Sequence, residues 1–260
     1  MKKTLIAVAV AATAAVSGSA MAADWINGST GGNAFEIEGT ISLETQKSPW
    51  EVAVGDTKSI PAIQIASGTQ EVSVSLDDNI PVLGIRSVAG GFQGSAFGSG
   101  LVPHISFNGG SISAQSFGAN GLANLKLEIK NNNQQVIGSL SSKLQAVGLA
   151  QHDSDASSLN ASNNADAFLN GLPRTEGNSV AAGEAVSVAE KLFPGVLQNW
   201  NDSVKVRTNY AWGFANTGKR YNAAYAAGIP SGTQMTLNLN EPVTTETDWK
   251  ASLPITISYN

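Results

Sequence analysis

Residues 125–129 read Leu-Lys-Leu-Glu-Ile, and residues 131–133, which follow closely, are three asparagines. Every second residue of the first run is apolar, and the residues between them are charged. This alternation predicts a β-strand with one buried and one solvated face, because successive side chains of a strand point to opposite sides. The asparagines favour a turn. We therefore expect a half-buried strand that ends in a turn.

The same two-residue period recurs along the chain, in residues 72–76, 204–212, 235–239 and 253–259. In the 204–212 run, the alternation places Tyr210 and Trp212 on the apolar face, which predicts that both rings pack in the core. The chain contains 27 glycines and only 13% charged residues, and it shows little helical periodicity. These features predict an all-β fold of short strands joined by turns.

The first 22 residues have the features of a secretory signal peptide. Met1 is followed by two lysines, an apolar run covers residues 5–16, and residues 20–22 read Ala-Met-Ala. The apolar run is too short to span a membrane as a helix, and the small residues predict cleavage after Ala22. We therefore predict export through the periplasm. Removal of the two lysines would change the formal charge from −5 to about −7.

The composition argues against several classes of protein. The chain has 20 acidic and 15 basic residues and no basic run, which disfavours a nucleic-acid partner. Cysteine is absent, so stability must come from the core and from binding partners. His104 and His152 lack the spacing of metal ligands, and we interpret both as solvated polar residues. We predict no enzyme activity, no catalytic residues, no cofactor and no metal.

Residues 150–202 differ from the alternating stretches around them. They begin with a polar loop rich in Ser, Asn and Asp, and two short helical patterns follow. The first helix would end at Leu169, and the second would be capped by Ser179 and end before Pro194. We predict a small, partly helical insertion at about 150–202 on the β scaffold.

A further alternating run lies near the start of the processed chain. Residues 35–43 read Phe-Glu-Ile-Glu-Gly-Thr-Ile-Ser-Leu and follow a Gly- and Ser-rich stretch that predicts flexibility. The run is either the first strand of the sandwich or a donor strand that completes the sheet of a neighbouring copy. In the second interpretation, Gly39 lies where the donor backbone passes a crowded spot. The face concerned comprises Phe35, Ile37, Gly39 and Ile41.

Three C-terminal stretches resemble the FaeG-like adhesive major pilins, the major fimbrial subunits of chaperone–usher fimbriae of enteric bacteria. They are residues 221–229 (YNAAYAAGI), 243–249 (VTTETDW) and 255–259 (ITISY). Residues 37–41 and 47–51 fit the same family, whereas the match fades between 150 and 200. Thr247 occupies a position where the wider pilin pattern often has glycine.

The resemblance implies an incomplete immunoglobulin-like sandwich that is completed by donor-strand exchange. Residues 23–43 would be the extension with the donor strand, and residues 44–260 the pilin domain. The implied partners are identical subunits in a linear polymer, a periplasmic chaperone, an outer-membrane usher and the glycans of host glycoproteins or glycolipids. The implied location is a fimbria on the cell surface. The strand presented to the chaperone would expose Leu253, Ile255, Ile257 and Tyr259.

A glycan site requires an aromatic platform for a sugar face, together with amides and charges that bond hydroxyl groups. The family's receptor-binding residues cannot be transferred, because the match is weakest where they would lie. Trp200 equally fits a structural anchor for the insertion. The alternatives are a purely structural shaft pilin without a receptor site and a periplasmic binding protein, which would need alternating helices. The candidate glycan-binding residues are Phe168, Arg174, Trp200, Asn201, Lys219, Arg220 and Tyr221.

Overall fold

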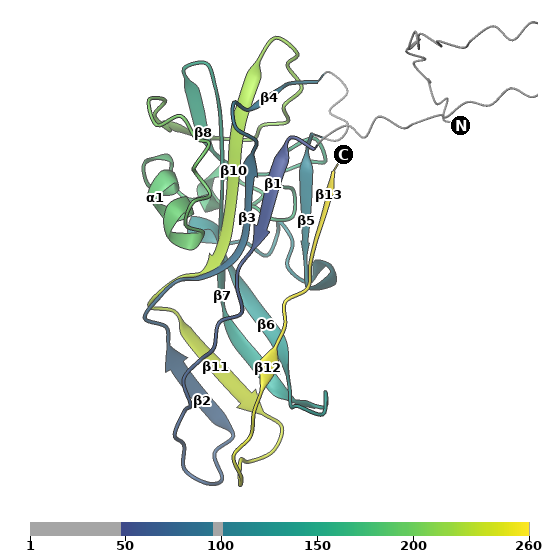
Figure 1. Ribbon diagram of the computed structural model, residues 1–260, viewed down its shortest axis with the longest axis vertical. Coiled ribbons are helices and arrows are strands. Elements are labelled where there is room, and N and C mark those ends of the chain that lie inside the picture. The colour runs from purple at the N-terminus through teal and green to yellow at the C-terminus, as the bar shows by residue number, and fades with distance from the viewer. Residues whose placement is uncertain (1–47, 96–100, 260) are drawn as a thin grey trace, which may run out of the picture. The chain divides into compact units, whose positions relative to one another are not determined.

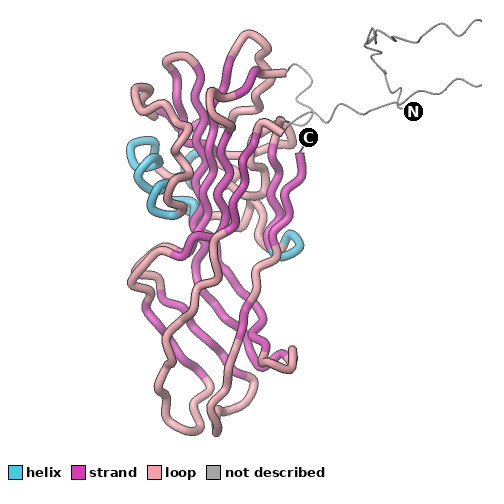
Figure 2. The backbone as a smooth tube through the Cα atoms, viewed as in Figure 1, coloured by secondary structure: helices cyan, strands magenta, loops and turns pink. Residues whose placement is uncertain are grey.

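The regular secondary structure in the described part of the chain consists almost entirely of β-strands, which are joined by loops and turns (Figures 1 and 2). This computed structural model describes residues 48–95 and 101–259; the predicted signal peptide and the predicted donor strand lie outside them. None of the helices in this part is long and apolar enough to cross a membrane. The elements are β1 (Trp50–Val54), β2 (Glu71–Ser75), β3 (Ile80–Ser87), β4 (Phe92–Gln93), β5 (Pro103–Phe107), β6 (Leu122–Lys130), β7 (Val136–His152), β8 (Asp155–Leu159), α1 (Ala182–Leu192), β9 (Thr208–Tyr210), β10 (Arg220–Ile229), β11 (Gln234–Leu239), β12 (Lys250–Ala251), β13 (Ile255–Tyr259) and three short 3-10 turns, Asn108–Gly110, Ala119–Gly121 and Glu176–Asn178.

Hydrogen bonding among the described residues joins eleven strands in one sheet and pairs β13 with β5 in a second. The main order is β1-β3-β10-β7-β11-β2, and every pairing is antiparallel except that of β8 with β9. The long strand β7 connects the two halves of this sheet (Figure 1). Its first half pairs with β6 and β11, and its second half pairs with β10 and β8. The predicted all-β sandwich is confirmed.

Strand β6 shows why these residues form a sandwich. Leu125, Leu127 and Ile129 are buried in the main core, and Lys126 and Glu128 between them are exposed, as the alternation predicts. Burying one apolar row while leaving the charged row in water satisfies both sets of side chains.

Strand β10 is buried on both faces. Tyr225 and Ala227 face the main core, whereas Ala224 and Ala226 face a second apolar cluster beneath α1. The alanines leave room for the helix, because small side chains let another element approach the sheet closely. The second predicted helix is thus confirmed, although it starts at Ala182, whose N–H group donates to Asn209 Oδ1 at 3.1 Å. Ser179 instead donates its hydroxyl to the Leu159 carbonyl at 3.1 Å.

The predicted helix that ends at Leu169 is wrong. The backbone N–H groups here bond to distant residues instead of to the preceding helical turn. Ala167 N donates to Trp212 O at 2.8 Å, and Phe168 N donates to Pro103 O at 2.8 Å. Phe168 also has a left-handed φ of 60°, which a helix excludes. Contacts between distant segments have therefore overridden the local helical preference.

Candidate functional site

A recess of about 580 Å³ opens beside β8 and β9. Its lining comes from two stretches of the sequence: residues 152–157, at the end of β7 and in β8, and residues within 205–221, which include β9, the loop after it and the start of β10. Backbone bonds hold these segments together, including Arg207 N to Ala156 O at 3.2 Å and the parallel β8–β9 pairing.

Two residues of the recess lining, Phe214 and Tyr221, belong to the main core. Phe214 is fully buried and has a left-handed φ of 56°. Its ring centroid lies 5.1 Å from Phe92 and 5.2 Å from Tyr221, and Tyr221 reaches the recess lining. A bulky residue adopts this backbone conformation only where its surroundings hold it there. Burial of the Phe214 ring thus positions the loop that carries Trp212.

His152 and Trp212 also line the recess. Their ring centroids are 4.7 Å apart with an interplanar angle of 34°, and Tyr221 meets His152 edge-on at 5.4 Å. His152 is therefore packed among aromatic rings, which corrects its interpretation as a solvated loop residue. The stacking fixes the Trp212 indole, which is only half-buried.

Tyr210 was expected in the core, but its side chain is 60% exposed. The predicted strand over 204–212 shrinks to β9, whose backbone pairs only with β8. Trp212 packs against the main core but is only partly buried, so the prediction of core packing holds in part for Trp212 and is wrong for Tyr210. Trp212 and Tyr210 are thus available to a ligand, and the combination of aromatic rings with Lys205 and Arg207 is the signal that could have indicated this.

The charged groups around the recess are of two kinds. Lys205, Arg207 and Asp155 belong to its lining. Beside it, Asp153 and Lys219 form an ion pair between two turns. The hydrogen bond from Lys219 lowers the pKa of Asp153, and the same bond raises the pKa of Lys219. The described residues contain no cluster of His, Asp or Glu suited to a metal ion. The arrangement can stack a ring and bond polar groups.

The structure places only one of the predicted glycan-binding residues, Tyr221, in the recess lining. Phe168 is fully buried and stacks on Tyr225, so its ring cannot meet a sugar. Lys219 pairs with Asp153, and Arg220 donates to the carbonyls of residues 90 and 91.

The remaining predicted residues lie apart from the recess lining. Trp200 packs against the second apolar cluster, which supports its role as an anchor. Asn201 is exposed, and its side-chain oxygen accepts a bond from Ser203 N at 3.1 Å. Arg174 is exposed on the loop before α1.

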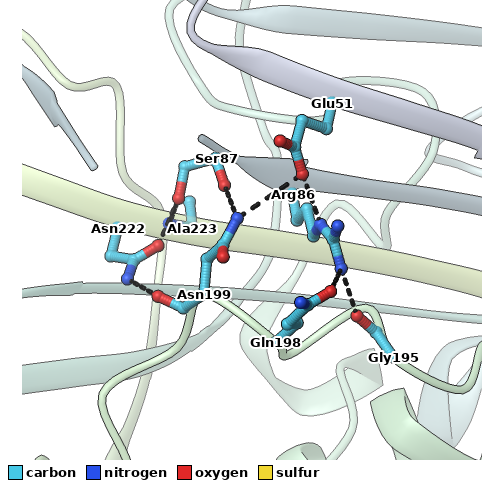
Figure 3. Close-up of polar contacts among 8 residues, drawn as sticks. All are labelled: Glu51, Arg86, Ser87, Gly195, Gln198, Asn199, Asn222 and Ala223. Carbon is cyan, nitrogen blue, oxygen red and sulfur yellow. Dashed lines mark hydrogen bonds and ion pairs between the residues drawn. The ribbon is translucent and has the colours of Figure 1, made fainter. Parts of the chain in front are cut away.

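A polar network holds the segment after α1 on the sheet (Figure 3). Arg86 on β3 bonds Glu51 on β1 at 2.6 Å and also donates to the Gly195 carbonyl at 2.7 Å. Asn199 donates to the Ser87 carbonyl at 2.8 Å, and Asn222 on β10 donates to the Asn199 carbonyl. The insertion is therefore tied to three strands of the sandwich rather than resting beside it.

A second candidate surface is formed by two strand edges. Among the described residues, β1 pairs only with β3 and β13 pairs only with β5, so each strand has one edge without a partner. Leu253, Ile255 and Ile257 pack against the main core but remain only partly buried. On β1, Val52 and Val54 are 44% and 64% exposed. Unpaired edges with exposed apolar residues are sites where another strand can add.

The described residues thus define an all-β sandwich with unpaired strand edges and a recess suited to a small polar ligand. The model of one family, described as "Fimbrial, major and minor subunit", matches residues 1–260, and the chain belongs to that family. Relatives include the K88 fimbrial protein AC of Escherichia coli, 30% identical over the whole of both chains. The F41 fimbrial protein and the K88 fimbrial protein AD of Escherichia coli are each 29% identical over the same share. The chain is therefore a fimbrial subunit, a structural component of a surface fimbria.

Proposed function

We propose that this subunit polymerises by donor-strand exchange, with residues 35–41 of one copy adding to the unpaired edges of the next. The observation that carries the proposal is the pair of open edges on β1 and β13, together with the partly buried Leu253, Ile255 and Ile257. A donor strand would form main-chain hydrogen bonds along the edge, and its alternate side chains would cover the exposed apolar row. The alternation places Phe35, Ile37 and Ile41, with Gly39 between the two isoleucines, at the every-second positions that such an edge requires.

The same surface explains the need for assembly partners. Before polymerisation, the open edge would template aggregation, so a periplasmic chaperone that lends its own strand would protect it. Exchange of that strand for the next subunit's extension would then occur at an outer-membrane usher. Export through the periplasm, directed by the signal peptide, follows from this route.

Supplying the donor strand within one chain tests the proposal. We delete the N-terminal extension and attach residues 33–45 after Asn260 through a flexible Gly-Ser linker. Burial of Phe35, Ile37 and Ile41 should contribute roughly 5–8 kcal/mol before the ordering cost. We expect a monomer whose melting temperature is at least about 5 °C above that of the same chain without the strand. A fusion with Ile37→Asp and Ile41→Asp is the control, and equal melting temperatures for the two fusions would contradict the proposal.

We also propose that the subunit itself binds host glycans, through the recess beside β8 and β9. The supporting observation is the half-buried Trp212, whose ring is fixed by His152 and Tyr221 and lines a recess of about 580 Å³. Fixed aromatic rings provide stacking area at a low cost in conformational entropy. The alternative remains a purely structural shaft subunit.

A glycan array distinguishes these two functions. We expect assembled fimbriae to bind a subset of host glycans, and Trp212→Ala to lower that affinity at least about tenfold because the stacking surface is removed. Trp200→Ala is the matched control, since Trp200 packs under α1 and outside the recess lining. Absence of binding to any glycan would favour the structural shaft subunit.

A further inference from the structure

The net charge of the recess lining is opposite in sign to the net charge of the whole chain. The chain carries 20 acidic and 15 basic residues. The recess lining has two cations, Lys205 and Arg207, and one carboxylate, that of Asp155. The recess is thus a basic spot on an acidic protein, and such a spot raises the local concentration of anionic ligands.

Of the two cations, Arg207 is the better candidate for binding an anion. Its backbone is fixed by the bond from Arg207 N to Ala156 O at 3.2 Å. Its guanidinium forms no hydrogen bond or ion pair with any residue that the structure describes, and no ion pair joins it to Asp155. By contrast, Arg86 and Arg220 each bond several partners. Arg207 therefore retains its full capacity to form a bidentate bond with an anion.

The other groups of the lining suit a sugar ring that carries this anion. Trp212 offers a fixed aromatic face, and Tyr210 beside it is 60% exposed. Asn216 accepts a bond from Gly218 N at 2.9 Å through its oxygen, which leaves its amide nitrogen as a donor for hydroxyl groups. An apolar sugar face, hydroxyl groups and a negative charge are the features of an acidic sugar.

We propose that the recess recognises an acidic sugar, with Arg207 pairing with its carboxylate or sulfate group and Trp212 stacking on its ring. This inference rests on the proposed glycan-binding function and specifies its ligand. Lys205 contributes a second positive charge; its ammonium is held near the Asp202 carbonyl at 3.3 Å.

Calorimetry tests this proposal. It measures the affinity of soluble, monovalent sugars for the full chain, which is purified as fimbriae. The probes are lactose, 3′-sialyllactose and 3′-sulfolactose, which share one neutral core. We expect at least one acidic sugar to bind at least about tenfold more tightly than lactose. Comparing the affinities of 3′-sialyllactose and 3′-sulfolactose then shows whether the recess prefers a carboxylate or a sulfate. The preference should shrink between about 0.05 and 0.5 M NaCl, since salt screens exposed charges.

The Arg207→Gln variant isolates the ion pair. It should bind the acidic sugar about tenfold more weakly and leave lactose binding within about twofold, because only the charge-assisted bond is removed. The matched control is Arg174→Gln, an exposed arginine outside the recess lining, which should behave as wild type. Equal binding of lactose and both acidic sugars, or an unchanged acidic preference in Arg207→Gln, overturns the acidic-sugar inference while glycan binding stands. Absence of binding to all sugars, including those of the array, overturns both.

Discussion

Chains that carry Ile37→Asp together with Ile41→Asp are expected to form no fimbriae. Both residues belong to the apolar face of the predicted donor strand, which would lie against the partly buried Leu253, Ile255 and Ile257 of the next subunit. Each aspartate would place an unpaired carboxylate in this apolar contact, at a cost of several kcal/mol. That cost is comparable to the whole gain from burying the strand, so we expect the loss of assembly to be complete.

The matched control places the same two charges on the opposite face of the strand, with Thr40→Asp and Ser42→Asp. These side chains would point away from the neighbouring subunit because strand residues alternate between faces. Electron microscopy of surface fibres, together with immunoblots of the periplasm, provides the measurement. We expect normal fibres from the control and subunits that accumulate without fibres from the double isoleucine variant. Normal fibres from both variants would exclude donor-strand exchange through this face.

Removing the Tyr225 side chain should have the largest effect on stability. Tyr225 lies on β10 and is fully buried; its ring stacks on Phe168 at 5.2 Å, and its hydroxyl donates to the Gly171 carbonyl at 3.0 Å. Tyr225→Ala creates a cavity and should lower the free energy of unfolding by about 3–5 kcal/mol. Tyr225→Phe keeps the ring but leaves the Gly171 carbonyl without its donor, at a cost of about 1–2 kcal/mol.

Urea denaturation of the complemented subunit checks these values, with Tyr210→Ala as the control because its side chain is 60% exposed. That variant should change the free energy of unfolding by less than about 0.5 kcal/mol. Since Tyr225 joins the sandwich to residues 168–171 of the insertion, the whole unit should unfold in one transition. A separate early transition of the insertion, or a Tyr225→Ala effect no larger than that of Tyr210→Ala, would contradict this role.

The buried hydroxyl of Tyr225 also predicts that the free energy of unfolding depends on pH. Burial raises the pKa of its hydroxyl well above the ordinary value of 10.0, because the phenolate would lose its hydration. The folded state therefore keeps a proton that the unfolded state releases above about pH 10. Stability from this group is complete below that pH and falls by up to about 1.4 kcal/mol per pH unit above it. The wild type should thus lose more stability between about pH 10 and 11 than Tyr225→Phe does, and identical slopes would contradict the prediction.

The strands with a solvated face were predictable from the sequence. Strand β6 buries Leu125, Leu127 and Ile129 as its alternation indicates, because one row of side chains faces a core and the other faces water. Helix α1 was predictable for the corresponding reason, and its apolar face buries Ala185, Ala189 and Leu192. The family match over the whole chain agrees with the resemblance seen in the C-terminal stretches.

The recess was not predictable, because its lining comes from two stretches, residues 152–157 and residues within 205–221, that only the tertiary structure brings together. The alternation around Tyr210 and Trp212 has the same form as that of β6, yet Tyr210 is 60% exposed, and Trp212 packs against the main core while remaining only partly buried. Phe168 differs from its prediction in the opposite direction. Its polar surroundings in the sequence predict an exposed ring, but the backbone bond to Pro103 and a left-handed φ place the ring in the core.

The sequence by itself determined the all-β class, the family and the spacing of the predicted donor strand, since each depends on residues that are close together along the chain. Only the tertiary structure decided which aromatic rings are exposed, which cations remain without partners, and which strand edges stay open. These properties depend on what lies opposite a side chain or a strand. A period of two shows that a strand has two faces, but it cannot show whether a core, a helix or water covers each of them.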